Sequence, residues 1–348
     1  MSTIRPDPRA RAPVQPHLRL GVRTAAVQRW WWSPFPAERI AALRLITGLF
    51  AWVYVVVRSP SLLSATDFSR QRFEPIGPLG WLDAPPPDFA VYALLTTCIA
   101  SGPLLILGWR HHVSGPIFAF AFMCCATYRS SWGMVFHTEN ILAIHLWVLA
   151  IAPSADRWSL DTRSGRSPGA DVVTARAAQG YYGWSVRTLC LTTVLTYVLA
   201  GWAKIEYVGM RWITGEAMQM QIAYDNVRKL LSGASYSELG MWLAPHQSLL
   251  AVGACLTLGM ELLAPVALFG PRLGWLWCLS VWVFHVAVLV LMAILFPYQL
   301  SGAAYVCFLR PESWHRLRRP LNRYFGPTGD APARALDRCS NRRRAHCV

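Results

Sequence analysis

Long runs of apolar residues constrain this chain more than any other feature. Most of them approach the roughly 20 residues that a helix needs to cross the hydrocarbon core of a bilayer. The runs lie near residues 38–58, 88–109, 113–135, 138–155, 186–205, 247–270 and 273–296, and a shorter one lies near 298–310. Because lipid offers no hydrogen-bond partner to an open backbone, segments of this length span a membrane as helices. The sequence therefore predicts an all-α fold, a polytopic membrane helix bundle of about eight transmembrane helices.

The basic residues indicate how such a bundle is oriented. The formal net charge of +15 would favour nucleic-acid binding in a water-soluble protein, but here the charges follow the predicted topology. If both termini are cytoplasmic, the inner segments hold 22 Arg and the outer segments hold six Arg or Lys. This asymmetry obeys the positive-inside rule. It predicts a multi-pass protein of the plasma membrane with both termini in the cytoplasm, and it predicts membrane lipid, not nucleic acid, as the partner of the basic segments.

The two ends of the chain differ in composition from the apolar part. Residues 1–28 combine several Arg with several Pro, which predicts a disordered basic tail without a cleavable signal peptide. Residues 316–348 form a second basic tail. The nine Cys show no metal-site spacing, and none falls in a predicted outer loop. We therefore expect neither a metal site nor a disulfide framework.

One lysine occupies an unusual position. Lys204 lies at the end of the 186–205 run, and only Lys229 joins it as a second Lys among 33 basic residues. An Arg side chain keeps its proton, whereas a Lys at membrane depth can lose it and act as a base. The alternative is a Lys that extends its amine to the lipid headgroups and has no chemical role.

Three further ionisable residues fall within or beside the predicted spans. His137 lies at the outer rim, and Glu261 and His285 lie about midway along their spans. Together with Lys204 they form a predicted column of titratable groups from the outer mouth toward the middle of the membrane. Such a column suits a base that ionises a lipid-soluble weak acid, and it equally suits a proton path in a transporter. A neutral polar pair that ties two helices together remains the structural alternative for Glu261 and His285.

Several short motifs resemble one family when they are read in order. They are Ala200-Gly201-Trp202-Ala203-Lys204, then Trp212, Gly215 and Met218 in a W-x-x-G-x-x-M pattern, Phe284-His285, Phe296, Pro311-Glu312-Ser313-Trp314, and the stretch from His137 to Asp161 with Arg157-Trp158-Ser159-Leu160-Asp161. This set resembles the vitamin K-dependent γ-glutamyl carboxylases and the wider horizontally transferred transmembrane (HTTM) domain family. The resemblance covers roughly residues 30–320, which places an HTTM-like transmembrane domain at 29–315.

The resemblance implies a chemistry. In the carboxylases the matching Lys deprotonates vitamin K hydroquinone, so Lys204 is expected to be a quinol base, with His137 and His285 as polar partners. Trp202, Trp212, Met218 and Glu261 are expected at the cofactor site, where Glu261 stands in place of an Asp of the carboxylases. The implied cofactor is a quinol, either vitamin K hydroquinone or menaquinol, and a secreted peptide is the implied second substrate.

Two departures from the carboxylases limit this expectation. The carboxylases have a large luminal domain after their helices, and this chain has a short tail there. Ala203 precedes Lys204 where the carboxylases have a second Lys. Quinol oxygenation or epoxidation is thus better supported than peptide carboxylation. The other readings are a non-catalytic helper in the maturation or export of a secreted peptide and a proton-linked transporter.

Overall fold

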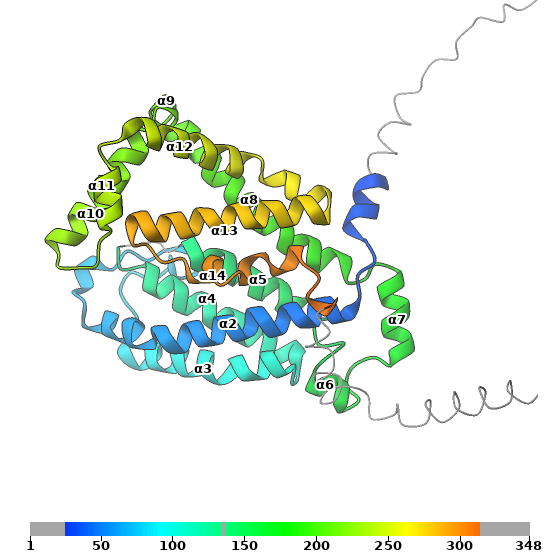
Figure 1. Cartoon of the computed structure of the whole chain (residues 1–348). Helices are drawn as coiled ribbons and strands as arrows, with labels where there is room; N and C mark the ends of the chain where they lie inside the picture. The colour runs from blue at the N-terminus through cyan, green and yellow to red at the C-terminus, as the bar shows by residue number, and fades with distance from the viewer. Residues whose placement is uncertain (1–24, 134–136, 314–348) are drawn as a thin grey trace, which may run out of the picture.

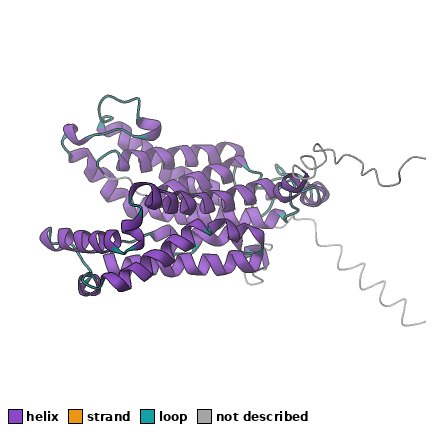
Figure 2. Cartoon of the chain, turned by 90° about the horizontal axis from the view of Figure 1, so that it is seen from above, coloured by secondary structure: helices purple, strands orange, loops and turns teal. Residues whose placement is uncertain are grey.

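The structure is a computed structural model, and it describes residues 25–133 and 137–313. Within these residues all regular secondary structure is helical, as predicted, and no strand occurs (Figure 2). The side chains of His137 and Thr138 are outside the description, and so are most of both predicted tails.

Four helices near the start of the chain form one half of the bundle. They are α2 (Ala37–Leu63), α3 (Asp88–Leu107), α4 (His111–Ser130) and α5 (His137–Ile151). Neighbours along the chain pack as antiparallel hairpins, and α2 also packs on α5 (Figure 1). Small residues bring these helices close, as is usual where lipid removes the hydrophobic drive between helices. A Cβ on Gly102 would lie 2.3 Å from Trp52, and one on Gly115 would lie 3.2 Å from the backbone of Ala150.

The second half of the bundle is built on α8 (Gly183–Tyr207), which packs against α5. It is completed by α12 (Gln247–Leu262), the 3-10 turn η4 (Ala264–Phe269) and α13 (Pro271–Met292). The short helices α9 (Met210–Ile213), α10 (Glu216–Leu231) and α11 (Glu238–Leu243) gather at one end of this half. At the opposite end lie α6 (Leu160–Arg163) and α7 (Ala170–Ala178) (Figure 1). We call the end with α9, α10 and α11 the Lys204 end, and the end with α6 and α7 the Arg44 end.

The predicted count of eight spans is not confirmed. Among the described residues, four helices are long and apolar enough to cross a membrane: Ala37–Asp67, Asp88–Leu107, Gly183–Tyr207 and Pro271–Met292. The shorter apolar helices Glu139–Ile151 and Gln247–Leu262 lie beside them. The final predicted run, 298–310, forms the four-residue helix α14 (Pro297–Leu300) and the 3-10 turn η5 (Ala303–Phe308).

The chain geometry between α14 and η5 explains why the last apolar run does not form a spanning helix. Gly302 has a φ of +76°, a left-handed conformation that ends the helix after a single turn. The residues that follow, Ala303 to Cys307, are buried, and η5 packs against α2, α8 and α13. This apolar run therefore fills the centre of the bundle instead of adding a long helix to it. The central core also takes in Phe118, Phe122, Leu142 and Leu146 from α4 and α5.

Candidate functional site

The last turns of α8 bring Lys204 close to α12. Gly201, one turn before Lys204, permits this approach, because a Cβ at Gly201 would lie 3.0 Å from both the Glu261 Cβ and a Leu262 methyl carbon. A larger residue at this position would force the two helices apart. The glycine of the Ala200–Lys204 motif thus sets the spacing at which Lys204 meets the end of α12.

Lys204 and Glu261 form an ion pair between Nζ and Oε1. The Glu261 side chain is 2% exposed and the Lys204 side chain is 19% exposed. The second carboxylate oxygen, Oε2 of Glu261, is buried and has no hydrogen-bond partner among the described residues. A buried acceptor without a partner costs about 1–3 kcal/mol. Because buried polar atoms are nearly always hydrogen-bonded, this oxygen is expected to receive a donor from a water molecule or a ligand.

Trp212 of α9 forms one wall beside this pair. Its ring centroid lies 4.8 Å from Lys204 Nζ, a cation–π distance, and its indole Nε1 donates to the Ala254 carbonyl oxygen over 3.1 Å. The indole is 5% exposed, so the hydrogen bond fixes its orientation in an apolar setting. Lys204, Glu261 and Trp212, predicted from separate positions in the sequence, therefore lie together.

The other two residues expected at the cofactor site lie apart from the pair. Trp202 is 57% exposed on the surface of α8. Met218, in α10, packs with the small cluster of Ile222, Ala244 and Leu250. The contacts of the described residues therefore do not bring the side chain of Trp202 or of Met218 to the Glu261 carboxylate.

His285 lies deeper, on α13, and is 4% exposed. Its Nδ1 donates to the Val281 carbonyl oxygen over 2.9 Å, which leaves Nε2 as the acceptor nitrogen of a neutral imidazole. Its ring meets those of Phe296 and Tyr197, with centroids 5.1 Å and 6.0 Å away.

Two tyrosines connect His285 with α8. The hydroxyls of Tyr197 and Tyr305 are 2.8 Å apart, and the Tyr305 hydroxyl lies 3.4 Å from His285 Nδ1. Tyr197 stands seven residues before Lys204, which is close to two helical turns, so both side chains lie on one face of α8. Nothing in the sequence around these two tyrosines distinguishes them from other aromatic residues of apolar segments. Their positions become informative only when η5 folds back between α8 and α13.

The two histidines of α5 have different outcomes. His137 begins the helix, and its side chain lies outside the described residues, so its predicted role as a polar partner stays a prediction. His145 is 3% exposed in the core, with Nδ1 2.8 Å from the Tyr298 hydroxyl and Nε2 3.2 Å from Thr193 Oγ1. His145 thus links α5, α8 and α14.

A second polar cluster lies at the Lys204 end. Its centre is Glu139, in the first turn of α5, whose side chain is 2% exposed. Its Oε1 accepts hydrogen bonds from the Tyr54 hydroxyl over 2.6 Å and from Arg129 over 2.5 Å. These residues line a cavity of about 20 Å³, room for about one water molecule. Tyr54 carried no signal in the sequence because it resembles any aromatic residue of an apolar helix.

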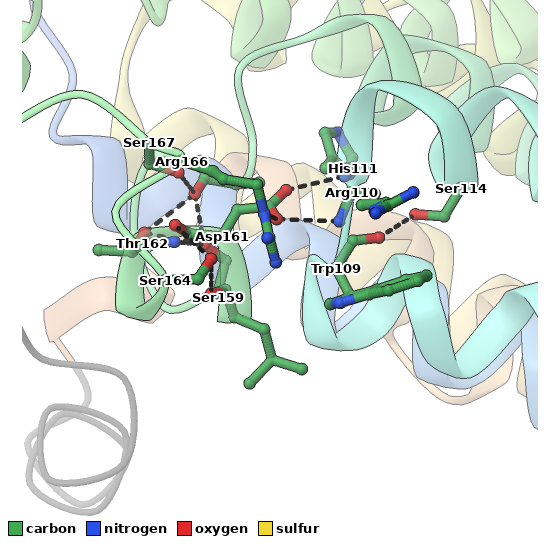
Figure 3. Close-up of polar contacts among 12 residues, drawn as sticks. Trp109, Arg110, His111, Ser114, Ser159, Asp161, Thr162, Ser164, Arg166 and Ser167 are labelled. Atoms are coloured by element: carbon green, nitrogen blue, oxygen red, sulfur yellow. Dashed lines mark hydrogen bonds and ion pairs between the residues drawn. The ribbon is translucent and has the colours of Figure 1, made fainter.

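The Arg157–Asp161 stretch leads into α6 at the opposite end of the bundle (Figure 1), and Figure 3 shows the contacts of Asp161 there. The Asp161 carboxylate accepts the backbone N–H groups of Arg110 and His111 over 2.9 and 2.8 Å, and Arg166 Nε donates to it over 3.0 Å. Burial acts to raise the pKa of Asp161, but these donors outweigh it and the pKa is lowered. The carboxylate therefore caps the N-terminus of α4. The Arg157–Asp161 stretch, one of the motifs that resemble the family, thus joins α6 to the start of α4, at the end of the bundle opposite Lys204.

The chain matches the family model of the HTTM domain across residues 32–314, which is most of its length. No curated protein and no solved structure matches it.

Proposed function

Because the chain belongs to the HTTM domain family, a family of membrane proteins related to the carboxylase core, we propose that it is a membrane enzyme that binds a quinol and uses Lys204 as its base. The proposal rests on one observation. A lysine and a glutamate are paired at the end of two apolar helices, and one buried oxygen of the glutamate lacks a hydrogen-bond partner among the described residues.

The residues present fit a quinol. A quinol hydroxyl is a hydrogen-bond donor, and Glu261 Oε2 is a buried acceptor in need of one. Trp212, whose ring lies beside Lys204, would be the aromatic neighbour of the bound ring. Tyr197, Tyr305 and His285 form a second, buried polar group farther into the bundle.

Glu261 gives Lys204 a way to become a base. An ammonium next to a carboxylate can pass its proton to that carboxylate, and the pair then consists of an amine and a carboxylic acid, both neutral. This exchange is favoured where burial penalises charge. The Lys204 amine can then accept a proton from a hydroxyl group placed at Nζ. An Arg at this position could not do so, since its guanidinium stays protonated.

The bound quinol would supply the acidic hydroxyl and all four electrons with which one dioxygen gives an epoxide oxygen and a water: two as the quinol becomes a quinone, and two as the quinone becomes its epoxide. The chain's own residues hold the hydroxyl, remove its proton and keep bulk water away from the base. A secreted peptide as second substrate remains part of the proposal, on the strength of the family relation alone.

The test is quinol epoxidation by purified protein in lipid nanodiscs. Reduced vitamin K and menaquinol are supplied separately with oxygen, and the epoxide is measured by mass spectrometry. Loss of a general base typically costs about 10²–10⁴-fold, so Lys204→Ala should fall at least about 100-fold below the wild type. Lys204→Arg should fall equally, because it keeps the charge but not the ability to lose a proton.

Lys229 provides a matched control. It is the second lysine of the chain and pairs with Asp225 over 2.6 Å on α10. Lys229→Ala should stay within a few-fold of the wild type. Equal, background-level epoxide from the wild type and Lys204→Ala with both quinols would remove the enzymatic proposal and leave the helper or the transporter. Labelled bicarbonate with candidate peptides tests carboxylation separately.

We also propose the cellular membrane and the orientation of the chain in it. The excess of Arg at the Arg44 end supports the plasma membrane with this end and both termini in the cytoplasm. Tags at the two termini should resist protease in intact cells and become sensitive after permeabilisation. Digestion of either tag in intact cells would contradict this orientation.

A further inference from the structure

The Arg44 end contains a cavity of about 340 Å³ that the proposed chemistry does not use. It lies between the first turns of α8 and α13, the 3-10 turn η4 and the segment before α2. Its volume falls within the roughly 300–1,000 Å³ that is typical of small-molecule sites. Arg187 in its wall stands 17 residues before Lys204 on α8, about 25 Å away, so the two sites are separate.

Three arginines line this cavity: Arg39, Arg187 and Arg310. Of these, only Arg39 has an acidic partner among the described residues, since its Nε and a terminal nitrogen contact Glu312 at 3.1 and 2.5 Å. The positive charges of Arg187 and Arg310 remain without a carboxylate there. The cavity wall therefore holds an excess of positive charge in a partly buried setting.

The guanidinium of Arg187 is held in place without losing that charge. Its Nε donates to the Trp30 carbonyl oxygen over 3.2 Å, and a terminal nitrogen donates to Ser33 Oγ over 3.3 Å. Its Cζ lies 4.6 Å from the Trp30 ring centroid and 5.2 Å from that of Phe35. These contacts use neutral partners only, so the fork keeps further N–H groups for an anion.

The surroundings indicate the kind of anion. Phe269, which lines the cavity, is 82% exposed, and Leu273 in the first turns of α13 is 43% exposed. In a membrane protein such exposed apolar side chains face lipid. Trp30 adds an aromatic ring of the kind found at the boundary between headgroups and acyl chains. The cavity thus joins a cationic pocket to an apolar surface, which a free inorganic anion would not need.

We propose that this cavity binds the phosphate group of an anionic phospholipid. Arg187 and Arg310 contact the phosphate, Arg39 stays paired with Glu312, and the acyl chains lie along Phe269 and the start of α13. The N-terminus of α13, which begins at Pro271 in the cavity wall, adds a favourable dipole to the two arginines.

The experiment is lipid retention by the full chain. Protein from nanodiscs with equal amounts of phosphatidylglycerol and phosphatidylcholine is extracted and analysed by native mass spectrometry. The wild type should retain phosphatidylglycerol in preference to phosphatidylcholine. Loss of a charge-assisted contact should weaken this preference about tenfold or more in Arg187→Gln and in Arg310→Gln.

Two variants keep the test decisive. Arg310 is exposed and its side chain is not part of a described ion pair, so Arg310→Gln should fold even if Arg187→Gln loosens the Trp30 segment. Arg272→Gln is the matched control. Arg272 is exposed in the first turn of α13, but it does not line the cavity. It should retain phosphatidylglycerol as the wild type does.

Thermal stability distinguishes the source of the phosphate. Phosphatidylglycerol should raise the apparent Tm of the wild type, and inorganic phosphate added to phosphatidylcholine nanodiscs should not. An equal rise with inorganic phosphate would mean a free-anion site and would overturn the lipid assignment. If Arg310→Gln and Arg187→Gln both retained as much phosphatidylglycerol as Arg272→Gln does, the proposed site would be wrong. Neither result depends on quinol activity.

Discussion

Two cations within the apolar helices, Arg44 and Lys204, are stabilised in opposite ways. Arg44 is 0% exposed, and its guanidinium donates to the backbone carbonyl oxygens of Ser154 and Trp158. Lys204 is 19% exposed along its side chain, and its partner is a carboxylate whose second oxygen has no hydrogen-bond partner in the part of the chain that the structure describes. Arg44 thus has fixed, neutral partners, whereas the partner of Lys204 is an ionisable side chain.

The contacts of Arg44 indicate a role in the fold, whereas those of Lys204 suit a binding site. The Arg44 contacts join α2 to the loop after α5, and Trp158 holds a left-handed φ of +50° while its carbonyl accepts from Arg44. A strained residue persists when its surroundings determine its conformation. A buried charge with complete hydrogen bonding therefore organises the fold. A buried charge whose partner is incomplete is the better candidate for binding a guest.

The largest expected effect is on folding, at Arg44. Arg44→Met would leave the carbonyl oxygens of Ser154 and Trp158 buried without donors, at a cost of about 1–3 kcal/mol for each oxygen. We expect little folded protein by size-exclusion chromatography in detergent. Arg72, exposed in the turn Arg70–Arg72, is the control, and Arg72→Met should behave as the wild type. A monodisperse Arg44→Met protein with an unchanged Tm would break the comparison.

The next effect is on activity, at Glu261. Glu261→Gln keeps the shape of the side chain but removes the proton acceptor beside Lys204, so kcat for epoxidation should fall about 100-fold. The apparent Tm should change less than it does in Arg44→Met, because one amide oxygen can still accept from Lys204. Glu216→Gln, at an exposed pair with Arg211, is the control. Full activity in Glu261→Gln would show that Lys204 does not need its partner.

A moderate effect is expected on the pH dependence of stability, at Asp161. Its pKa is lowered in the folded state, so its contribution to stability is present above the unfolded pKa, near 3.8, and is lost as the pH falls through that value and below. Asp161→Asn should destabilise the protein by about 1–2 kcal/mol at pH 7 through the loss of charge-assisted bonds. Apparent Tm values of the two proteins should converge toward pH 3. A constant difference across this range would assign the effect to packing instead of charge.

The smallest effect is expected at Trp202. Its indole is 57% exposed, whereas that of Trp212 lies beside Lys204. Trp202→Ala should leave epoxidation within about twofold of the wild type, since exposed substitutions seldom disturb a fold. Trp212→Ala should lower the activity more strongly. The reverse order in matched assays would place the guest on the lipid-facing side of α8.

Much of the helical architecture followed from the sequence. The long apolar runs at 38–58, 88–109, 186–205 and 273–296 each correspond to a helix long enough to span a membrane, because runs of this length can satisfy their backbone in lipid only as helices. The short run at 298–310, predicted as the eighth helix, instead forms α14 and η5. Periodicity could not reveal that Gly302 would turn the chain and bury Tyr305 in the centre.

The candidate site shows the same division. A single lysine in an apolar setting, with a carboxylate 57 residues later, was visible in the sequence because charge at membrane depth is costly and rare. Sequence could not tell that Glu261 would pair with Lys204, that Trp212 and not Trp202 would lie beside it, or that Tyr197 and Tyr305 would meet. Those contacts depend on the close approach of α8 and α12 at Gly201 and on the return of η5 between helices.

By itself, then, the sequence determined that this chain forms a bundle of membrane helices and which residues are costly to bury there. Both follow from local composition, since hydration and backbone hydrogen bonding act on each segment alone. The tertiary structure decided which costly residues meet one another. Pairing across helices depends on packing distances that small residues and turns set, and those distances are not written in any single segment.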